Sequence, residues 1–404
     1  MRWAARMSQL GTESAFEVLA RAKLLEEQGA EIVHLEIGEP DFATPPHIVA
    51  AAEAAIEDGY THYTPAGGIP EVREAVAAHY ATRIGNDVKG GEVILTPGSK
   101  NILLFAMLAL IEAGDEVIVP DPGYPIYASL VSFMGAKPVS LRLREESGFR
   151  FDAGELASLV TDRTRMIILN SPQNPTGGIL HQEDLVAVAE LAVQHDLWVV
   201  SDEIYSQIVY EGDVASIASI PGMRERTIIM DGLSKAYAMC GWRLGIGVAP
   251  AELIKAMETL MINSSSCATA FIQVATLAAL ESPDSDISVQ RMVEEYRRRR
   301  DVVVDGLNAI PGVRCHRPGG AFYVFPNVSD IGVDQKLLAD ALLAEAGVAV
   351  LPGTAFGAMG KGYLRLSYAQ AVPVLERGLG RIRDFLAGDG VARLKEGAGA
   401  ALSH

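Results

Sequence analysis

One lysine, Lys235, stands in a loop between two short apolar runs in the stretch IIMDGLSKAYAMCGWRLGIGV. The runs, at 228–230 and 245–248, have the composition of buried strands. A lysine between such strands can lie at the bottom of a cleft, where low polarity favours the neutral, nucleophilic amine. Such an amine forms an imine with an aldehyde, so the stretch is compatible with carbonyl chemistry. A solvated loop lysine is the simpler alternative.

Three other sites place polar groups where chemistry could use them. Asp202 follows the apolar run LWVV, at the carboxyl end of an expected buried strand, where α/β sheets bind ligands, although it could also cap a turn. Gly98-Ser99-Lys100 precedes an expected helix at 101–112, whose free amides and dipole would attract an anion. A plain helix cap is the alternative there. Arg365 lies inside the alternating strand YLRLSY, where it either faces inward and needs a partner or faces outward into solvent.

A longer pattern joins these sites. Ser234, Lys235, Gly241, Arg243 and Gly245 form S-K-x-x-x-x-x-G-x-R-x-G, which resembles the pyridoxal-phosphate attachment segment of class I and II aminotransferases. Five further motifs resemble the same family in the same order: GEPDF (38–42), THYTPAGG (61–68), NSPQNPTG (170–177), SDEIY (201–205) and GYLRLSYA (362–369). Together they cover roughly residues 34 to 370.

The resemblance implies a site for pyridoxal 5'-phosphate. Lys235 would hold the cofactor and move the proton at the substrate's α-carbon, and Asp202 would face the protonated ring nitrogen. Tyr205 and Asn174 resemble the pair that hydrogen-bonds the cofactor's phenolic oxygen. Tyr124 resembles the aromatic residue that stacks on the cofactor ring. The phosphate contacts would come from Ser99, Lys100, Ser234 and Arg243. Gly232 stands where many members have a serine, which leaves one phosphate contact in question.

The same resemblance implies the substrate and the assembly. Arg365 would pair bidentately with the substrate's α-carboxylate, with Gly38 and Asn174 nearby, so an amino or 2-oxo acid is the expected ligand. Tyr63 resembles a tyrosine that reaches the phosphate of the neighbouring subunit, which implies a homodimer with shared active sites.

Three functions remain open from the sequence. The first is an aminotransferase that moves an amino group from an L-amino acid to a 2-oxo acid. The second is a β-elimination lyase acting on cysteine-type substrates with the same lysine, and the third a catalytically silent binding protein. Aspartate with 2-oxoglutarate is a family-level expectation for the first. However, no Lys or Arg occurs between Lys255 and Arg291, where aspartate-type members often supply an arginine for the distal carboxylate.

Composition and charge restrict the classes of partner that this protein is expected to bind. The chain has 404 residues and a formal net charge of -17, which argues against a nucleic-acid or anionic-membrane partner. Its one basic run, at 297–300, is expected to be a solvated helix face. The three cysteines are far apart and odd in number, which predicts free thiols in a cytoplasmic protein. No spacing typical of a metal site, signal peptide or membrane span is present.

The element pattern predicts an α/β fold. From residue 93 short strands alternate with helices, and runs such as MIIL, WVV and TIIM are apolar on consecutive positions, as in a parallel sheet covered on both faces. With the resemblance, this predicts a large domain (45–290) in which a mostly parallel seven-stranded sheet lies between helical layers. A smaller α+β domain would combine 1–44 with 291–404. The Gly- and Ala-rich tail from Gly388 is expected to be loosely ordered.

Overall fold

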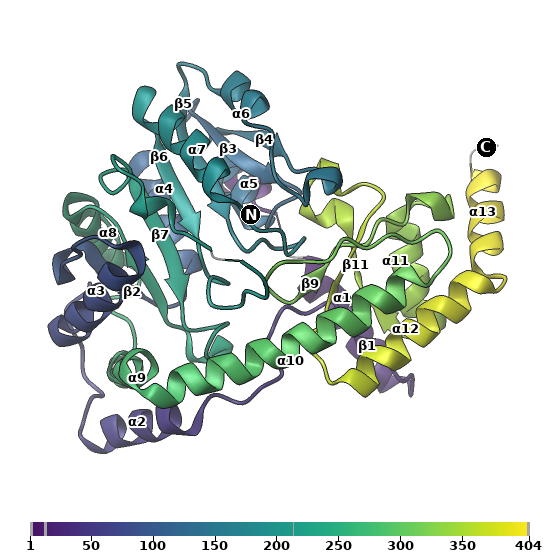
Figure 1. Ribbon diagram of the computed structural model, residues 1–404, viewed down its shortest axis with the longest axis horizontal. Helices are drawn as coiled ribbons and strands as arrows, with labels where there is room; N and C mark the ends of the chain where they lie inside the picture. Colours follow the sequence, from purple (N-terminus) through teal and green to yellow (C-terminus); the bar gives the residue numbers. More distant parts are fainter. Residues whose placement is uncertain (1–2, 12–13, 213, 402–404) are drawn as a thin grey trace.

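The computed structural model describes residues 3–11, 14–212 and 214–401 and shows two parts (Figure 1). The larger part contains a seven-stranded sheet, and the smaller contains a three-stranded antiparallel sheet and a two-stranded parallel pair. The long helix α10 (Pro283–Asn308) runs from one part to the other along the lower edge of the view.

The seven-stranded sheet has the order β2-β8-β7-β6-β5-β3-β4, and only β8 runs antiparallel to its neighbours. The predicted α/β fold with a mostly parallel seven-stranded sheet is therefore confirmed. Its strands are β2 (Val93–Thr96), β3 (Glu116–Asp121), β4 (Lys137–Arg142), β5 (Thr164–Asn170), β6 (Trp198–Asp202), β7 (Thr227–Gly232) and β8 (Gly245–Val248).

Helices cover both faces of this sheet because successive residues of its central strands point to opposite sides, and both sides are apolar. One side, with Val117, Ile168 and Val200, belongs to a core shared with α4 and α8. The other side, with Ile118, Ile167 and Val199, packs with α6 and α7. The helices of this part are α2 (Pro46–Glu57), α3 (Pro70–Ile84), α4 (Lys100–Leu110), α5 (Ile126–Phe133), α6 (Ala153–Leu159), α7 (Gln182–Gln194), α8 (Ala251–Ser264) and α9 (Ala270–Glu281).

The strand directions bring several loops to one edge of the sheet. The parallel strands β5, β6 and β7 end there at Asn170, Asp202 and Gly232. Because β8 is antiparallel to both β2 and β7, its first residue lies at the same edge, with Gly245 opposite Thr96 on one side and Gly232 on the other. The segments around 98, 170–174, 202–205 and 232–245 therefore meet at this edge.

The smaller part is built from short strands and a few helices. We propose the division into 45–290 and 1–44 with 291–404, which is supported because β2 to β8 all fall inside the first range and the remaining strands outside it. The boundary at 290 lies within α10. The elements are β1 (Val33–His34), β9 (Tyr323–Val324), β10 (Val348–Ala349), β11 (Leu351–Pro352), β12 (Leu364–Ser367), α1 (Ser14–Glu27), α11 (Gln335–Ala346), α12 (Val372–Ala387) and α13 (Gly390–Ala401).

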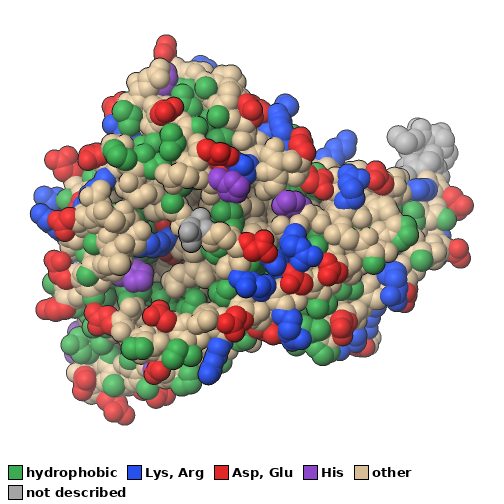
Figure 2. All heavy atoms as spheres, viewed as in Figure 1, with side chains coloured by type: hydrophobic (Ala, Val, Ile, Leu, Met, Phe, Trp, Pro, Cys, Tyr) green, Lys and Arg blue, Asp and Glu red, His purple; other side chains and the backbone are tan. Residues whose placement is uncertain are grey.

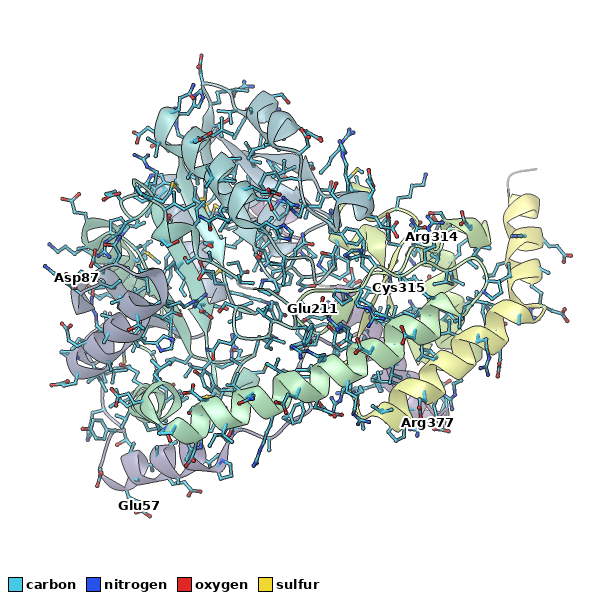
Figure 3. The ribbon with its side chains drawn as sticks, viewed as in Figure 1. Glu57, Asp87, Glu211, Arg314, Cys315 and Arg377 are labelled. Carbon is cyan, nitrogen blue, oxygen red and sulfur yellow. The ribbon has the colours of Figure 1, made fainter. Side chains whose placement is uncertain are left out.

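The expectation of a solvated basic face at 297–300 is wrong for two of its arginines. Arg299 and Arg300 are only 5% and 3% exposed. Arg299 pairs with Asp41 at 2.7 Å and lies over the Phe42 ring, whereas Arg300 lies 3.2 Å from Glu211, which is labelled beside the middle of α10 in Figure 3. Their partners come from segments distant in sequence, which a helical charge pattern does not reveal.

The expectation of a loosely ordered tail is also wrong over most of its length. Residues 390–401 form α13, which stands at the far end of the smaller part (Figure 1). The helix packs on α11 and α12, and Val391 and Leu394 contact the apolar core of that part. Alanine favours helix and offsets the cost of the three glycines, so composition alone was a poor guide here.

The surface agrees with the acidic composition. On the face shown in Figure 2, Lys and Arg side chains lie scattered among Asp and Glu rather than in one basic patch. Within the described residues, none of the helices combines the length and the apolar character that crossing a membrane requires.

Candidate active site

A cavity of about 480 Å³ lies at the carboxyl edge of the large sheet and reaches the smaller part. Of the residues that the sequence predicts to bind cofactor or substrate through a named contact, eleven line this cavity and Tyr63 does not. From the large part come Ser99, Lys100, Tyr124, Asn174, Asp202, Tyr205, Ser234, Lys235 and Arg243, and from the remainder Gly38 and Arg365. Tyr63 is 88% exposed, on a loop outside this cavity. The structure therefore brings these distant motifs into one place.

Lys235 follows the end of β7 in a tight turn. The Met239 N–H donates to the Ser234 carbonyl at 3.1 Å and so holds the turn closed around it. The Lys235 amine donates to the Gly38 carbonyl at 2.6 Å and lies 3.7 Å from the Cys240 sulfur. It also lies 6.0 Å from the centre of the Tyr205 ring. The amine thus opens into the cavity, with one carbonyl as its close partner.

Asp202, the last residue of β6, is buried in the cavity wall. Its Oδ2 accepts a hydrogen bond from the Tyr127 hydroxyl at 2.5 Å, and its Oδ1 accepts one from the Ile204 N–H at 3.3 Å. Burial raises the pKa of the Asp202 carboxyl to about 7, although both hydrogen bonds act to lower it. Among the described residues, no Lys, Arg or His forms an ion pair with it. Asp202 is therefore a buried acid without a counter-ion.

At another wall of the cavity, helix α4 begins next to Arg243. A Cβ on Gly245 would lie 2.4 Å from the Ser99 nitrogen, and one on Gly98 would lie 2.1 Å from Arg243 Nη2. Gly98 also has a φ of +91°, which glycine tolerates best. Both glycines are needed for β8, the start of α4 and the arginine to approach so closely. Free helix amides and a guanidinium side by side form a site suited to an anion such as phosphate.

Arg365, on β12, is buried and faces inward, as expected of a charge with a specific partner. Its guanidinium donates to the Glu36 carbonyl and, at 3.4 Å, to Asn174 Oδ1, and it lies 4.6 Å from the centre of the Tyr323 ring. The Arg365 Nε has no hydrogen-bond partner. Burial lowers the pKa of Arg365 from its usual value. Arg365 is thus a buried cation whose hydrogen-bond partners are neutral acceptors, and the charge of the buried Glu36 carboxyl acts on it without a salt bridge.

Tyr205 and Asn174 line the same cavity as Asp202 and Arg365. The hydroxyls of Tyr205 and Tyr323 share a hydrogen bond of 2.7 Å. Burial raises the pKa of Tyr205 well above the usual value, so its phenol remains a hydrogen-bond donor. The Asn174 N–H donates to Asn170 Oδ1 at 2.9 Å, which fixes the loop after β5. Tyr124 stands at the wall, with the Lys100 amine 5.7 Å from its ring centre.

The lining residues that had no role predicted from the sequence include Tyr127, Tyr323 and Cys240. Tyr127 lies one helical turn after Tyr124 in DPGYPIY, and this spacing was the available signal. Cys240 lies inside the loop of Lys235 itself. Tyr323 belongs to a strand whose inward face could not be assigned without its partners, and its hydroxyl fills the space beside Gly38, where a Cβ would lie only 2.0 Å from it.

The contact between Tyr127 and Asp202 generates a prediction. Tyr127→Phe removes the hydroxyl donor to the carboxylate, and hydrogen bonds to charged groups contribute about 1.5–3 kcal/mol. We therefore expect the pKa of Asp202 to rise by about one unit or more, which infrared titration of the carboxylate band would measure. Tyr237→Phe is the matched control, because that hydroxyl contacts Gln207 instead. An unchanged titration in Tyr127→Phe would contradict the assignment.

Comparison with known proteins agrees with this site. The family model described as aminotransferase class I and II matches residues 30–382. The aspartate aminotransferase of Pyrococcus horikoshii is 42% identical over 92% of this chain and 94% of its own. The aromatic-amino-acid aminotransferase 2 of Thermococcus litoralis is 42% identical over 88% of this chain and 92% of its own. A solved structure, the aspartate aminotransferase from Thermus thermophilus with maleate, has a TM-score of 0.91 and 41% identity, covering 95% of this chain and 99% of that one. With a match over most of its length in sequence and in fold, this chain belongs to the class I and II aminotransferases.

Proposed function

We propose that this protein is a pyridoxal 5'-phosphate-dependent aminotransferase that moves an amino group from an L-amino acid to a 2-oxo acid. One observation carries the proposal: the amine of Lys235 opens into a cavity that also holds a buried carboxylate, Asp202, and a buried guanidinium, Arg365, and neither of these forms a salt bridge with another residue that the structure describes. A site of this kind suits a ligand that brings a cation to Asp202 and a carboxylate to Arg365.

The residues present fit the cofactor. Asp202 would meet the protonated ring nitrogen, since it lacks a cation of its own. Arg243, the first amides of α4 and the hydroxyls of Ser99 and Ser234 would hold the phosphate, and Tyr205 with Asn174 would face the phenolic oxygen. Lys235 offers the amine for the aldehyde. When bound, the ring supplies a sink for the electron pair left at the substrate's α-carbon.

The chain's own groups then divide the work. Arg365 would hold the substrate's α-carboxylate and so orient the α-carbon toward Lys235. The Lys235 amine would take the proton from that carbon and return it, as base and then acid. Asp202 would keep the ring nitrogen protonated throughout. Tyr205, whose phenol stays protonated, would donate to an oxyanion.

Replacing Lys235 tests the proposal directly. Lys235→Ala should lower turnover at least about a hundredfold, because one group performs both proton transfers. The visible absorbance of the cofactor joined to the amine should vanish as well. Lys23→Ala, on α1, is a control for the loss of an ordinary lysine. A Lys235→Ala enzyme with wild-type turnover would refute the assignment.

The relatives favour amino-group transfer over the lyase and over a silent binding protein. The three relatives named above are aminotransferases by name, and the positions for acid-base chemistry are filled in this chain. Release of ammonia and pyruvate from cysteine-type donors would instead support the lyase. The cytoplasmic location stays a prediction.

For the substrate, we propose the aspartate and 2-oxoglutarate type. Two of the three relatives above are named aspartate aminotransferases, and one of these was solved with maleate, a dicarboxylate. The relative named for aromatic amino acids makes aromatic donors the second candidate. The stretch without Lys or Arg between Lys255 and Arg291 means that a distal carboxylate would need another partner.

Arg365→Lys separates recognition of the α-carboxylate, which all amino donors share, from recognition of the donor's side chain. The lysine keeps the charge but loses the two parallel donors, so KM should rise about tenfold or more for every amino donor. A panel of donors against 2-oxoglutarate and pyruvate measures this, and aspartate should remain first in rank. An equal KM in variant and wild type would show that Arg365 does not bind the α-carboxylate.

We also propose a homodimer with shared active sites. Tyr63 is a large side chain exposed to 88%, and Ile262 on α8 is exposed to 62%, both of which suit a contact with a second copy. Tyr63 would reach the phosphate in the partner's cavity.

Complementation tests this arrangement. Tyr63→Phe should weaken cofactor binding about two- to tenfold, the effect of one lost hydrogen bond. In a heterodimer of Tyr63→Phe with Lys235→Ala, one site regains both groups, so half of the sites should bind the cofactor with wild-type affinity. Tyr60→Phe is the control on the neighbouring surface. A monomer by sedimentation, or no recovery in the heterodimer, would overturn the proposal.

A further inference from the structure

A cluster of four charged and polar side chains lies behind Asp202. Arg83, in the last turn of α3, contacts two carboxylates at once: Asp231 Oδ2 at 2.8 Å and Glu203 Oε2. The Tyr80 hydroxyl also donates to Asp231 Oδ2, at 2.8 Å. Glu203 and Asp231 are 3% and 6% exposed. The cluster is thus a single guanidinium between two buried acids.

The hydrogen bonds of both acids suit the carboxylate form, which only accepts, although burial raises the pKa of Asp231. Asp231 Oδ1 accepts the Gly232 N–H at 2.7 Å, and Glu203 Oε1 accepts the hydroxyls of Ser201 at 2.8 Å and Ser216 at 2.6 Å. Each carboxylate oxygen therefore has a donor. Two carboxylates and one guanidinium leave the cluster with one net negative charge.

This cluster adjoins Asp202 without entering the cavity. Glu203 is the next residue in the chain, and Asp231 follows Met230, which is opposite Asp202 in the register of β6 and β7. Asp202 and Met230 line the cavity, whereas Glu203 and Asp231 do not, because neighbouring side chains of a strand point to opposite sides. The field of Glu203 and Asp231 acts on Asp202 and raises its pKa, after the larger effect of burial.

We propose that Arg83 is a positioning residue that keeps Asp202 ionised by offsetting the two carboxylates behind it, and so sets the pH range in which the enzyme holds its cofactor. Arg83 touches neither the cavity nor the reacting atoms. The inference rests on the proposed function, in which Asp202 meets the ring nitrogen. The titratable or charged groups around Asp202 are Tyr127 from α5, Tyr124 from the loop before α5, Tyr80 and Arg83 from α3, Asp231 from β7, and Glu203, Tyr205 and Lys235 from the loops at the sheet edge.

Charge-matched variants test the proposal. Arg83→Gln leaves the cluster with two negative charges, Glu203→Gln leaves it neutral, and the double variant restores the original single charge. Glu203→Gln is a mild change, because the hydroxyls of Ser201 and Ser216 can accept from the new amide as well as donate. The readouts are the dissociation constant of pyridoxal 5'-phosphate as a function of pH and the acidic limb of kcat/KM, each with thermal unfolding as a check on folding.

The expected shifts have opposite signs. In Arg83→Gln the acidic midpoint should move up by about one pH unit, because an uncompensated neighbouring charge holds the proton on Asp202. In Glu203→Gln the midpoint should move down, and in the double variant it should return to the wild-type position. If Arg83 only braced α3 against the sheet, the variants would lose thermal stability while the midpoint stayed in place, and that result would overturn the inference.

Asp202→Asn distinguishes this inference from the proposed function. If Asp202 pairs with the cofactor, that variant should bind it far more weakly and lose the acidic midpoint. An unchanged midpoint in Asp202→Asn would refute the role of Asp202 and with it the inference. A midpoint that disappears in Asp202→Asn but stays fixed in Arg83→Gln and Glu203→Gln would overturn the role of Arg83 alone. Glu203→Gln keeps Arg83 and its pairing with Asp231, so the test survives even if Arg83→Gln does not fold.

Discussion

Two buried charges of opposite sign line one cavity, and neither forms a salt bridge with another residue that the structure describes. Asp202 and Arg365 have been removed from water, and their hydrogen-bond partners are hydroxyl, amide and carbonyl groups rather than ions. Such groups cost stability, and a protein retains them when a ligand supplies the missing charges. Because each of these buried charges destabilises the folded state, the pair indicates a binding function rather than a structural one. The rest of the fold holds both charges at the wall of one cavity.

The sheet topology explains how a chain of this length achieves that. Parallel strands place their carboxyl ends together, which gathers Asn170, Asp202 and the loop of Lys235. The one antiparallel strand, β8, returns Arg243 to the same edge, beside the start of α4. Arg365 comes from β12 of the smaller part. The cavity therefore depends on both parts, although most of its polar groups come from the loops of a single sheet edge.

The sequence was most informative where local pattern and position coincide. Lys235, Asp202 and Arg365 could be located because a loop, a strand end and an alternating strand are readable from neighbouring residues, and the family resemblance implied the role of each in one site. The expected helix at 101–112 and the expected strands at 228–230 and 245–248 correspond to α4, β7 and β8, with ends that differ by at most two residues. Tyr127 was missed because its hydrogen bond to Asp202 joins residues far apart in the chain. Arg299 and Arg300 were misjudged for the same reason, since a helix with acidic neighbours reads as solvated until Asp41 and Glu211 are brought to it.

The close approach of Gly98 and Gly245 has a consequence for how such a site can diverge. A Cβ on Gly245 would collide with the backbone of Gly98 and Ser99, and a Cβ on Gly98 would collide with the Arg243 guanidinium of the proposed anion site. Few substitutions are therefore expected to be tolerated at Gly98 and Gly245. At the Asp202 end the surroundings are side chains, and exchanges among them alter charge without moving the main chain. Substitutions that adapt the enzyme to another pH or another amino donor are therefore expected to accumulate around Asp202. The end of the cavity at Gly98 and Gly245 is expected to stay almost unchanged among related proteins.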